Sequence, residues 1–239
     1  MRYDAYLFDL YGTLVDIRTD ETASVLWETL ARFYAEHRAK WTGAALQCAF
    51  ESETEKQLHR NGAAYPEIDL APVFAALYRC YGVQTDDCLL AETAWRFRMA
   101  STERLRLYAG AKELLCALRK QGKVILLSNA QRLFTMPELR MLGLADAFDA
   151  IYLSSDYGCK KPDPVFFQLP VDQFGLDPKR CLMIGNDPAC DIAGAHAMGM
   201  DAYYIRSAIS PKGAPSRIDA AFSQPRMDLV RVRVRLCGE

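Results

Sequence analysis

Two charged residues, Asp9 and Lys161, are the first candidates for chemistry in this sequence. Asp9 follows the apolar run AYLF at residues 5–8, which is typical of a strand covered on both faces, and Gly12 lets the chain turn tightly after it. Held against a bound electrophile, a carboxylate can attack and form a covalent ester or acyl phosphate. A buried carboxylate needs a partner. Lys161 supplies a cation for Asp9 and for a transferring anionic group.

Two further motifs supply an anion site and oxygen ligands. Ser128 and Asn129 end the strand-like run KVILLSN, and a hydroxyl beside backbone N–H groups at the start of a helix binds anions well. Asp187 and Asp191 are four residues apart on one face of a predicted helix, where they would be hard-oxygen ligands for Mg²⁺. Each motif alone is more typical of a helix cap or a loop. Their joint occurrence at the ends of successive elements favours a site.

The elements that must position these residues alternate between strand and helix after residue 110. Strands are expected at 123–129, 150–155, 181–186 and 202–205, and helices at 111–121, 132–142 and 187–198, with another opening at 162–164. This alternation predicts an α/β fold with a doubly wound parallel sheet. Ligands of such sheets bind at the carboxyl ends of the strands. The motif residues are therefore expected at one edge.

The segment 17–99 differs from the rest of the chain. It contains four stretches with apolar residues at helical spacing and no convincing strand. We therefore expect an inserted all-helical domain at 17–99 and an α/β core domain formed by 1–16 and 100–239. In the tail from 209, a strand at 219–222 is expected, and residues 227–236 (MDLVRVRVRL) fit a terminal helix better than a strand.

Composition limits the partners. Net charge is −1, apolar residues make up 51% of the 239, and no Lys/Arg run is long enough for a nucleic-acid surface. The N-terminal apolar run is short and interrupted by acids, so neither a signal peptide nor a membrane span is expected. Eight scattered cysteines without a CxxC pair are typical of free thiols. We expect a cytoplasmic protein that holds a small anionic substrate by local groups.

The four motifs also carry a resemblance. FDLYGTLVD, LLSNA, KKPDP and IGNDPACDIAGA resemble the four motifs of the haloacid dehalogenase (HAD) superfamily of hydrolases, and they span the chain from Asp9 to about Ala195. The resemblance implies that Asp9 is an aspartate nucleophile and that the core is Rossmann-like, with the first and fourth motif strands as neighbours. It also implies that the helical segment 17–99 is the mobile cap of this superfamily.

Charge counting predicts a metal at this site. Asp9, Asp187 and Asp191 contribute three negative charges and Lys161 one positive charge, so an anionic substrate would be repelled. One divalent cation brings this sum to zero. We predict Mg²⁺ with Asp9, the Tyr11 backbone carbonyl and Asp187 as ligands, and with Asp191 as a ligand or directly behind the ligands.

Two residues depart from the family pattern. Tyr11 stands where the phosphatases of the superfamily carry a second aspartate, which protonates the leaving group. With an ordinary pKa near about 10, a tyrosine donates a hydrogen bond but is a poor base at neutral pH. A tyrosine here is similar to the 2-haloacid dehalogenases of the superfamily, which use no metal. Counted from Asp191, Asn186 occupies the place of the metal aspartate of many relatives, whereas Asp187 fits a shorter spacing, and either is a candidate ligand.

The sequence therefore predicts a hydrolase with three functional hypotheses. The first is a Mg²⁺-dependent phosphatase for a small phosphorylated metabolite, with Asp9, Tyr11 and Lys161 as catalytic residues and Ser128 and Asn129 binding the phosphate. The second is a metal-free 2-haloacid dehalogenase. The third is a relative with low turnover that serves in binding or regulation.

Overall fold

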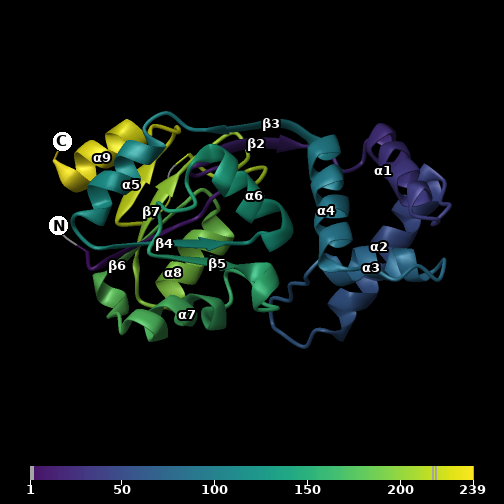
Figure 1. Ribbon diagram of the computed structural model, residues 1–239. Coiled ribbons are helices and arrows are strands. Elements are labelled where there is room, and N and C mark those ends of the chain that lie inside the picture. The colour runs from purple at the N-terminus through teal and green to yellow at the C-terminus, as the bar shows by residue number, and fades with distance from the viewer. Residues whose placement is uncertain (1–2, 217, 219, 239) are drawn as a thin grey trace.

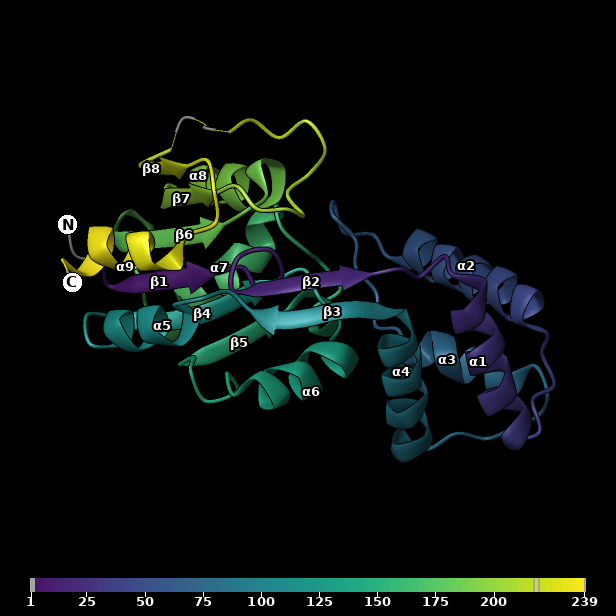
Figure 2. The ribbon, with the colours of Figure 1, turned by 90° about the horizontal axis from the view of Figure 1, so that it is seen from above.

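The computed structural model describes residues 3–216, 218 and 220–238. Its centre is a six-stranded sheet (Figure 1) in the order β5-β4-β1-β6-β7-β8, with parallel neighbours throughout (Figure 2). The strands are β1 (Ala5–Phe8), β4 (Lys123–Ser128), β5 (Ala150–Leu153), β6 (Cys181–Gly185), β7 (Asp201–Ile205) and β8 (Phe222–Gln224). Because β1 lies between β4 and β6, the strands of the first, second and fourth motifs are adjacent. The predicted pairing of the first and fourth motif strands is confirmed.

Helices cover both faces of the sheet, which explains the continuous apolar runs of its strands. Tyr6 and Phe8 of β1 pack into the core on one face, and Ala5 and Leu7 into the core on the other. The helices of the first face are α5 (Ala111–Arg119), α6 (Arg132–Leu142) and α9 (Leu229–Cys237), and those of the second are α7 (Pro164–Phe174) and α8 (Ala193–Ala197) (Figure 1). The predicted doubly wound α/β fold is confirmed.

A separate group of helices, which we call the helical unit, lies beside the sheet (Figure 2). It consists of α1 (Ser24–Glu36), α2 (Gly43–Arg60), α3 (Ala71–Arg79) and α4 (Asp87–Ser101). The helical unit has a separate hydrophobic core that is rich in aromatic rings, among them Trp27, Phe50 and Phe97. Phe97 of α4 also stacks on Phe134 of α6, with 5.8 Å between ring centroids, so the helical unit contacts the core at this point.

Two strands that the sequence did not reveal connect the helical unit to the core. β2 (Val15–Thr19) and β3 (Thr102–Leu107) form an antiparallel ribbon (Figure 2). The expectation that residues 17–99 contain no strand was therefore wrong at residues 17–19. The reason is physical: a strand of five residues gives a short alternation, and this one is stabilised by pairing with β3, about 90 residues further along the chain.

The C-terminal part matches the prediction with two differences. The terminal helix α9 is present, with Leu229, Val232 and Leu236 buried along one face. A strand was expected at 219–222; β8 covers Phe222–Gln224, and residue 219 lies outside the described residues. The predicted helix 187–198 begins as a π-helical turn, Pro188–Ile192, before α8. Within the described residues, no helix combines the length and the apolar character needed to cross a membrane.

Candidate active site

Asp9 lies at the carboxyl edge of the sheet, in a polar pocket of about 170 Å³. The chain turns after β1 and hydrogen-bonds the Asp9 N–H to the carbonyl oxygen of Ile184 in β6 at 3.0 Å. The pocket is lined by every residue that the sequence predicted for the site, from Asp9 to Asp191. The parallel order of β4, β1 and β6 is what brings these distant positions together.

Lys161 forms the centre of the charged group. Its Nζ lies 2.8 Å from Asp9 Oδ1 and 2.7 Å from Asp191 Oδ1, and the lysine and Asp191 are almost completely buried. Burial alone would lower the pKa of Lys161, but the charges of Asp191 and Asp9 outweigh it and hold this pKa above its ordinary value. Lys161 is therefore a fixed positive charge against Asp9.

Two hydroxyl groups and one amide hold this arrangement in place. Ser128 Oγ donates to Asp9 Oδ1 at 3.3 Å, and Thr13 Oγ1 donates to Asp9 Oδ2 at 3.2 Å. The side chain of Asn129 binds the backbone of Lys161 at both its N–H (2.8 Å) and its carbonyl oxygen (3.0 Å). Asn129 thus fixes the segment that presents the lysine. Thr13 was not among the predicted site residues, although its position one turn after Asp9 is a usable signal.

The two acids of the fourth motif are bound largely within their own segment. Asp187 Oδ1 accepts hydrogen bonds from the N–H groups of Ala189 (2.8 Å) and Cys190 (3.0 Å), and Asp191 Oδ2 accepts one from the Asp187 N–H (2.9 Å). These side-chain bonds to the backbone compete with the regular α-helical pattern at this helix start. A Cβ on Gly185 would lie 2.2 Å from Asp191 Oδ2, so only glycine fits there.

Asn186, not Asp187, contacts Asp9. One end of its amide lies 3.2 Å from Asp9 Oδ2 and 3.3 Å from the Tyr11 carbonyl oxygen, and the other end lies 3.2 Å from Ser207 Oγ. With the NH₂ group toward Asp9, the amide donates to both oxygens and accepts from Ser207. With its oxygen toward Asp9, three oxygen atoms converge, an arrangement that a cation between them stabilises.

These donors fit Mg²⁺. Carboxylate, backbone carbonyl and amide oxygens are all ligands that this ion accepts. Of the three oxygen atoms that face one another here, only that of Asp9 carries a charge. Among the described residues, no cluster of three or more His, Cys, Asp and Glu side chains is suited to a metal. The neighbouring thiol of Cys190 does not compete, because burial raises its pKa to about 12 and keeps it neutral.

The side chain of Tyr11 points into a buried network that joins the core to the helical unit. Its hydroxyl donates to Glu138 of α6 and lies 3.1 Å from Thr135 Oγ1. Arg98 of α4 binds the same carboxylate, with 2.6 Å between Nε and Glu138 Oε1, and its guanidinium lies 5.4 Å from the Tyr11 ring centroid. Burial and the Glu138 charge raise the pKa of Tyr11, so the phenol stays neutral. No pattern in the sequence indicated Arg98 or Glu138 as residues of the site.

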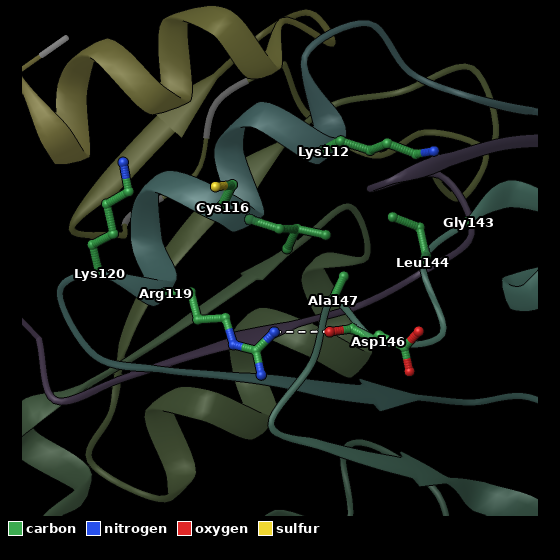
Figure 3. A pocket seen from close by; sticks show the side chains of 9 residues that line it. Lys112, Cys116, Arg119, Lys120, Gly143, Leu144, Asp146 and Ala147 are labelled. Carbon is green, nitrogen blue, oxygen red and sulfur yellow. Dashed lines mark hydrogen bonds between the residues drawn. The ribbon is translucent and has the colours of Figure 1, made fainter.

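Two other cavities differ in where they lie relative to the polar pocket. One, of about 300 Å³, shares Tyr11 and Asn129 with the polar pocket and extends toward the helical unit. The other, of about 480 Å³, lies between α5 and the loop after α6, where Arg119 Nη1 donates to the Asp146 carbonyl oxygen at 2.8 Å (Figure 3). In the described part of the chain, the walls of this second cavity come from residues 112–120 and 143–147, which belong to none of the four motifs.

A family model for haloacid dehalogenase-like hydrolases matches residues 3–199. The chain belongs to this family of hydrolases. The resemblance of the four motifs is thereby confirmed at the level of the family.

Relatives with assigned activities are similar over different lengths. The chain is 32% identical over 124 residues to a phosphoserine phosphatase from Thermus thermophilus, a match that spans 52% of this chain and only 48% of that protein. It is 30% identical to a phosphoglycolate phosphatase from Nitrosococcus oceani over 80% of this chain and 78% of that one. The crystal structure of a 2-haloacid dehalogenase from Pseudomonas syringae pv. Tomato superposes with a TM-score of 0.67, covers 98% of both chains and is 20% identical, which shows the shared HAD fold.

The buried Arg98–Glu138 pair generates a prediction about stability. Arg98→Met leaves the Glu138 carboxylate buried without a counter-ion, and we expect a loss of about 3–5 kcal/mol in the free energy of unfolding, measured by urea denaturation. Adding Glu138→Gln should recover part of this loss, because a neutral amide still accepts from Tyr11. As a matched control, Arg18→Met breaks the exposed pair with Glu103 and should cost at most about 1 kcal/mol. A loss of similar size in both single variants would contradict the structural role of the buried pair.

Proposed function

We propose that the chain hydrolyses small phosphorylated metabolites with Asp9 as the nucleophile. The observation that carries this proposal is the position of the Lys161 ammonium, 2.8 Å from the Asp9 carboxylate, in a small polar pocket at the sheet edge. An anion entering this pocket meets a fixed cation directly beside the attacking carboxylate. The relatives named as phosphatases support phosphate as the anion.

In this proposal each residue has a defined part. The Asp9 carboxylate forms a bond to phosphorus while the bond to the leaving oxygen breaks, and water then hydrolyses the aspartyl-phosphate. Lys161 balances the charge that collects on the phosphoryl group, and Ser128 and the backbone N–H of Asn129 bind its oxygens. The helical unit acts as a cap that excludes water and contributes to substrate choice.

Mg²⁺ is part of the same proposal. Asp9 Oδ2, the Tyr11 carbonyl oxygen and Asn186 Oδ1 would hold it, and Asp187 lines the same pocket. When bound, the ion would supply positive charge that draws the phosphate to Asp9. Asp191 remains paired with Lys161 and serves to position the lysine.

The nucleophile is tested with p-nitrophenyl phosphate. Release of p-nitrophenol should require Mg²⁺ and fall by at least about 1,000-fold in Asp9→Asn, because an amide oxygen does not form the covalent intermediate. Circular dichroism should show that the variant is folded. Turnover by Asp9→Asn at the wild-type rate would exclude Asp9 as the nucleophile.

The metal ligand is tested by binding of MgCl₂ alone, measured by isothermal titration calorimetry. Asn186→Asp adds a charged oxygen facing Asp9 and should tighten Mg²⁺ binding by about tenfold or more. Asp187→Asn is the matched control: its amide oxygen still accepts from the same backbone N–H groups, and it should change the affinity much less. The opposite ranking of the two variants would assign the ligand role to Asp187.

A metal-free 2-haloacid dehalogenase is the second candidate. The observation that favours it is the other orientation of the Asn186 amide, in which NH₂ donates to Asp9 and to the Tyr11 carbonyl oxygen and takes the place of the cation. In that reaction the Asp9 carboxylate attacks the carbon that bears the halogen, and halide leaves with the bonding electron pair.

The second candidate predicts chloride release from 2-chloropropionate in the presence of EDTA, measured with a chloride electrode. The dehalogenase hypothesis requires the rate to be equal with and without the chelator and to disappear in Asp9→Asn. No chloride release by a preparation that hydrolyses p-nitrophenyl phosphate would leave phosphatase activity as the function.

A further inference from the structure

The direction of the Tyr11 side chain bears on which substrates the proposed phosphatase can use. Tyr11 occupies the position from which a leaving group would receive a proton, two residues after Asp9. A phenol has a single O–H, and that of Tyr11 is donated to Glu138, while Thr135 contacts the same oxygen at 3.1 Å. Glu138 in turn is held by Arg98. The hydroxyl proton of Tyr11 is thus donated to a side chain of α6 and not to a group bound beside Asp9.

The other proton donors around Asp9 are engaged as well. The hydroxyl groups of Ser128 and Thr13 both point at the Asp9 carboxylate itself. The ammonium of Lys161 is held between Asp9 and Asp191. Among the described residues that hydrogen-bond to the Asp9 side chain, none is a carboxylic acid. No group in contact with the nucleophile is therefore positioned to protonate a departing oxygen.

An oxygen that departs without a proton leaves as an anion, and this is fast only when the anion is weakly basic. Building on the proposed function, we propose that the chain acts on phosphates whose leaving group is a weakly basic oxygen, such as acyl, enol and aryl phosphates. Phosphates of simple alcohols, whose alkoxides are strongly basic, are poor substrates.

The adjoining cavity of about 300 Å³ has room for a leaving group next to the pocket for the phosphoryl group, because the two share Tyr11 and Asn129. Its walls are mixed: Ile17, Leu70 and Phe134 are apolar, whereas Glu21 and Arg98 are charged. The cavity therefore accommodates a leaving group of this size, and the missing proton donor sets the preference for a weakly basic one.

The reaction balances without an added acid. An Asp9 oxygen bonds to phosphorus, the bond from phosphorus to the leaving oxygen breaks, and that oxygen departs with the electron pair as a carboxylate, enolate or phenolate. Water then attacks phosphorus and gives up a proton to solvent. The phosphorus bond to Asp9 breaks, which restores the carboxylate and releases inorganic phosphate.

The test is the dependence of kcat/KM on the basicity of the leaving group, measured with Mg²⁺ for a series from p-nitrophenyl to phenyl phosphate. This ratio reports the step in which the leaving group departs. We expect phenyl phosphate to be slower than p-nitrophenyl phosphate by about 100-fold or more, the factor that a general acid otherwise supplies. Tyr11→Phe should show the same steep dependence, whatever its absolute rate, because the hydroxyl donates no proton to the leaving group.

Three results would overturn the proposal. A shallow dependence in the wild-type protein would show that the leaving group is protonated. If Tyr11→Phe makes the dependence steeper, Tyr11 is the donor, and if Glu21→Gln does so, the donor is Glu21, a carboxyl group in the wall of the adjoining cavity. Equal rates for all members of the series would refute only the preference for weakly basic leaving groups, whereas no hydrolysis of any phosphate would refute the proposed phosphatase activity as well.

Discussion

The contact on which the site depends is the buried lysine between two aspartates. Taken out of water, the ammonium of Lys161 and the carboxylates of Asp9 and Asp191 are each strongly destabilised. They are tolerated because the ammonium lies within 2.8 Å of an oxygen of each carboxylate. Several segments of the core must therefore hold these three residues in place. The lysine backbone is held by Asn129 after β4, Asp9 by the end of β1, and Asp191 by the segment after β6. The same pairing that makes burial tolerable also aligns the charged groups of the pocket.

The sequence was sufficient to predict the contents of this pocket because the determinants are local. An apolar strand followed by an acid, and alternating strands and helices, fix which residues reach the carboxyl edge of a parallel sheet. Asp9, Ser128 and Lys161 met there as the four motifs indicated. The β2–β3 ribbon was missed because it consists of one short pairing between segments about 90 residues apart, and each segment carries only a brief alternation of apolar and polar residues.

The direction in which individual side chains point was the second feature that could not be predicted from the sequence. The spacing of Tyr11 from Asp9 predicted a catalytic role for its side chain. Its hydroxyl instead donates to Glu138, 127 residues further along the chain, and Glu138 accepts from Arg98 on α4. Such buried partners satisfy one another in three dimensions, and Arg98 and Glu138 lie within helices whose sequence does not mark them as buried. The network also has a physical consequence: the helical unit is tied through Arg98 and Glu138 to the residue whose carbonyl oxygen faces Asn186. Arg98 and Glu138 thus form a continuous chain of contacts from α4 to Tyr11 at the edge of the site.

At the proposed Mg²⁺ site, an asparagine instead of an aspartate at position 186 would lower the attraction of this pocket for a cation. Counting Asp9, Asp187 and Asp191 against Lys161 gives a sum of −2, but Lys161 is bound to two of the acids and Asp187 is turned to the backbone of its own segment. The atoms that face one another around Asp9 Oδ2 then carry a single negative charge. An amide is the side chain best suited to such a place, since its oxygen stabilises a cation and its NH₂ group stabilises the carboxylate when no cation is bound. The arrangement of Asp9, Tyr11 and Asn186 is thus electrostatically satisfied in both states, which a second carboxylate at position 186 would not allow.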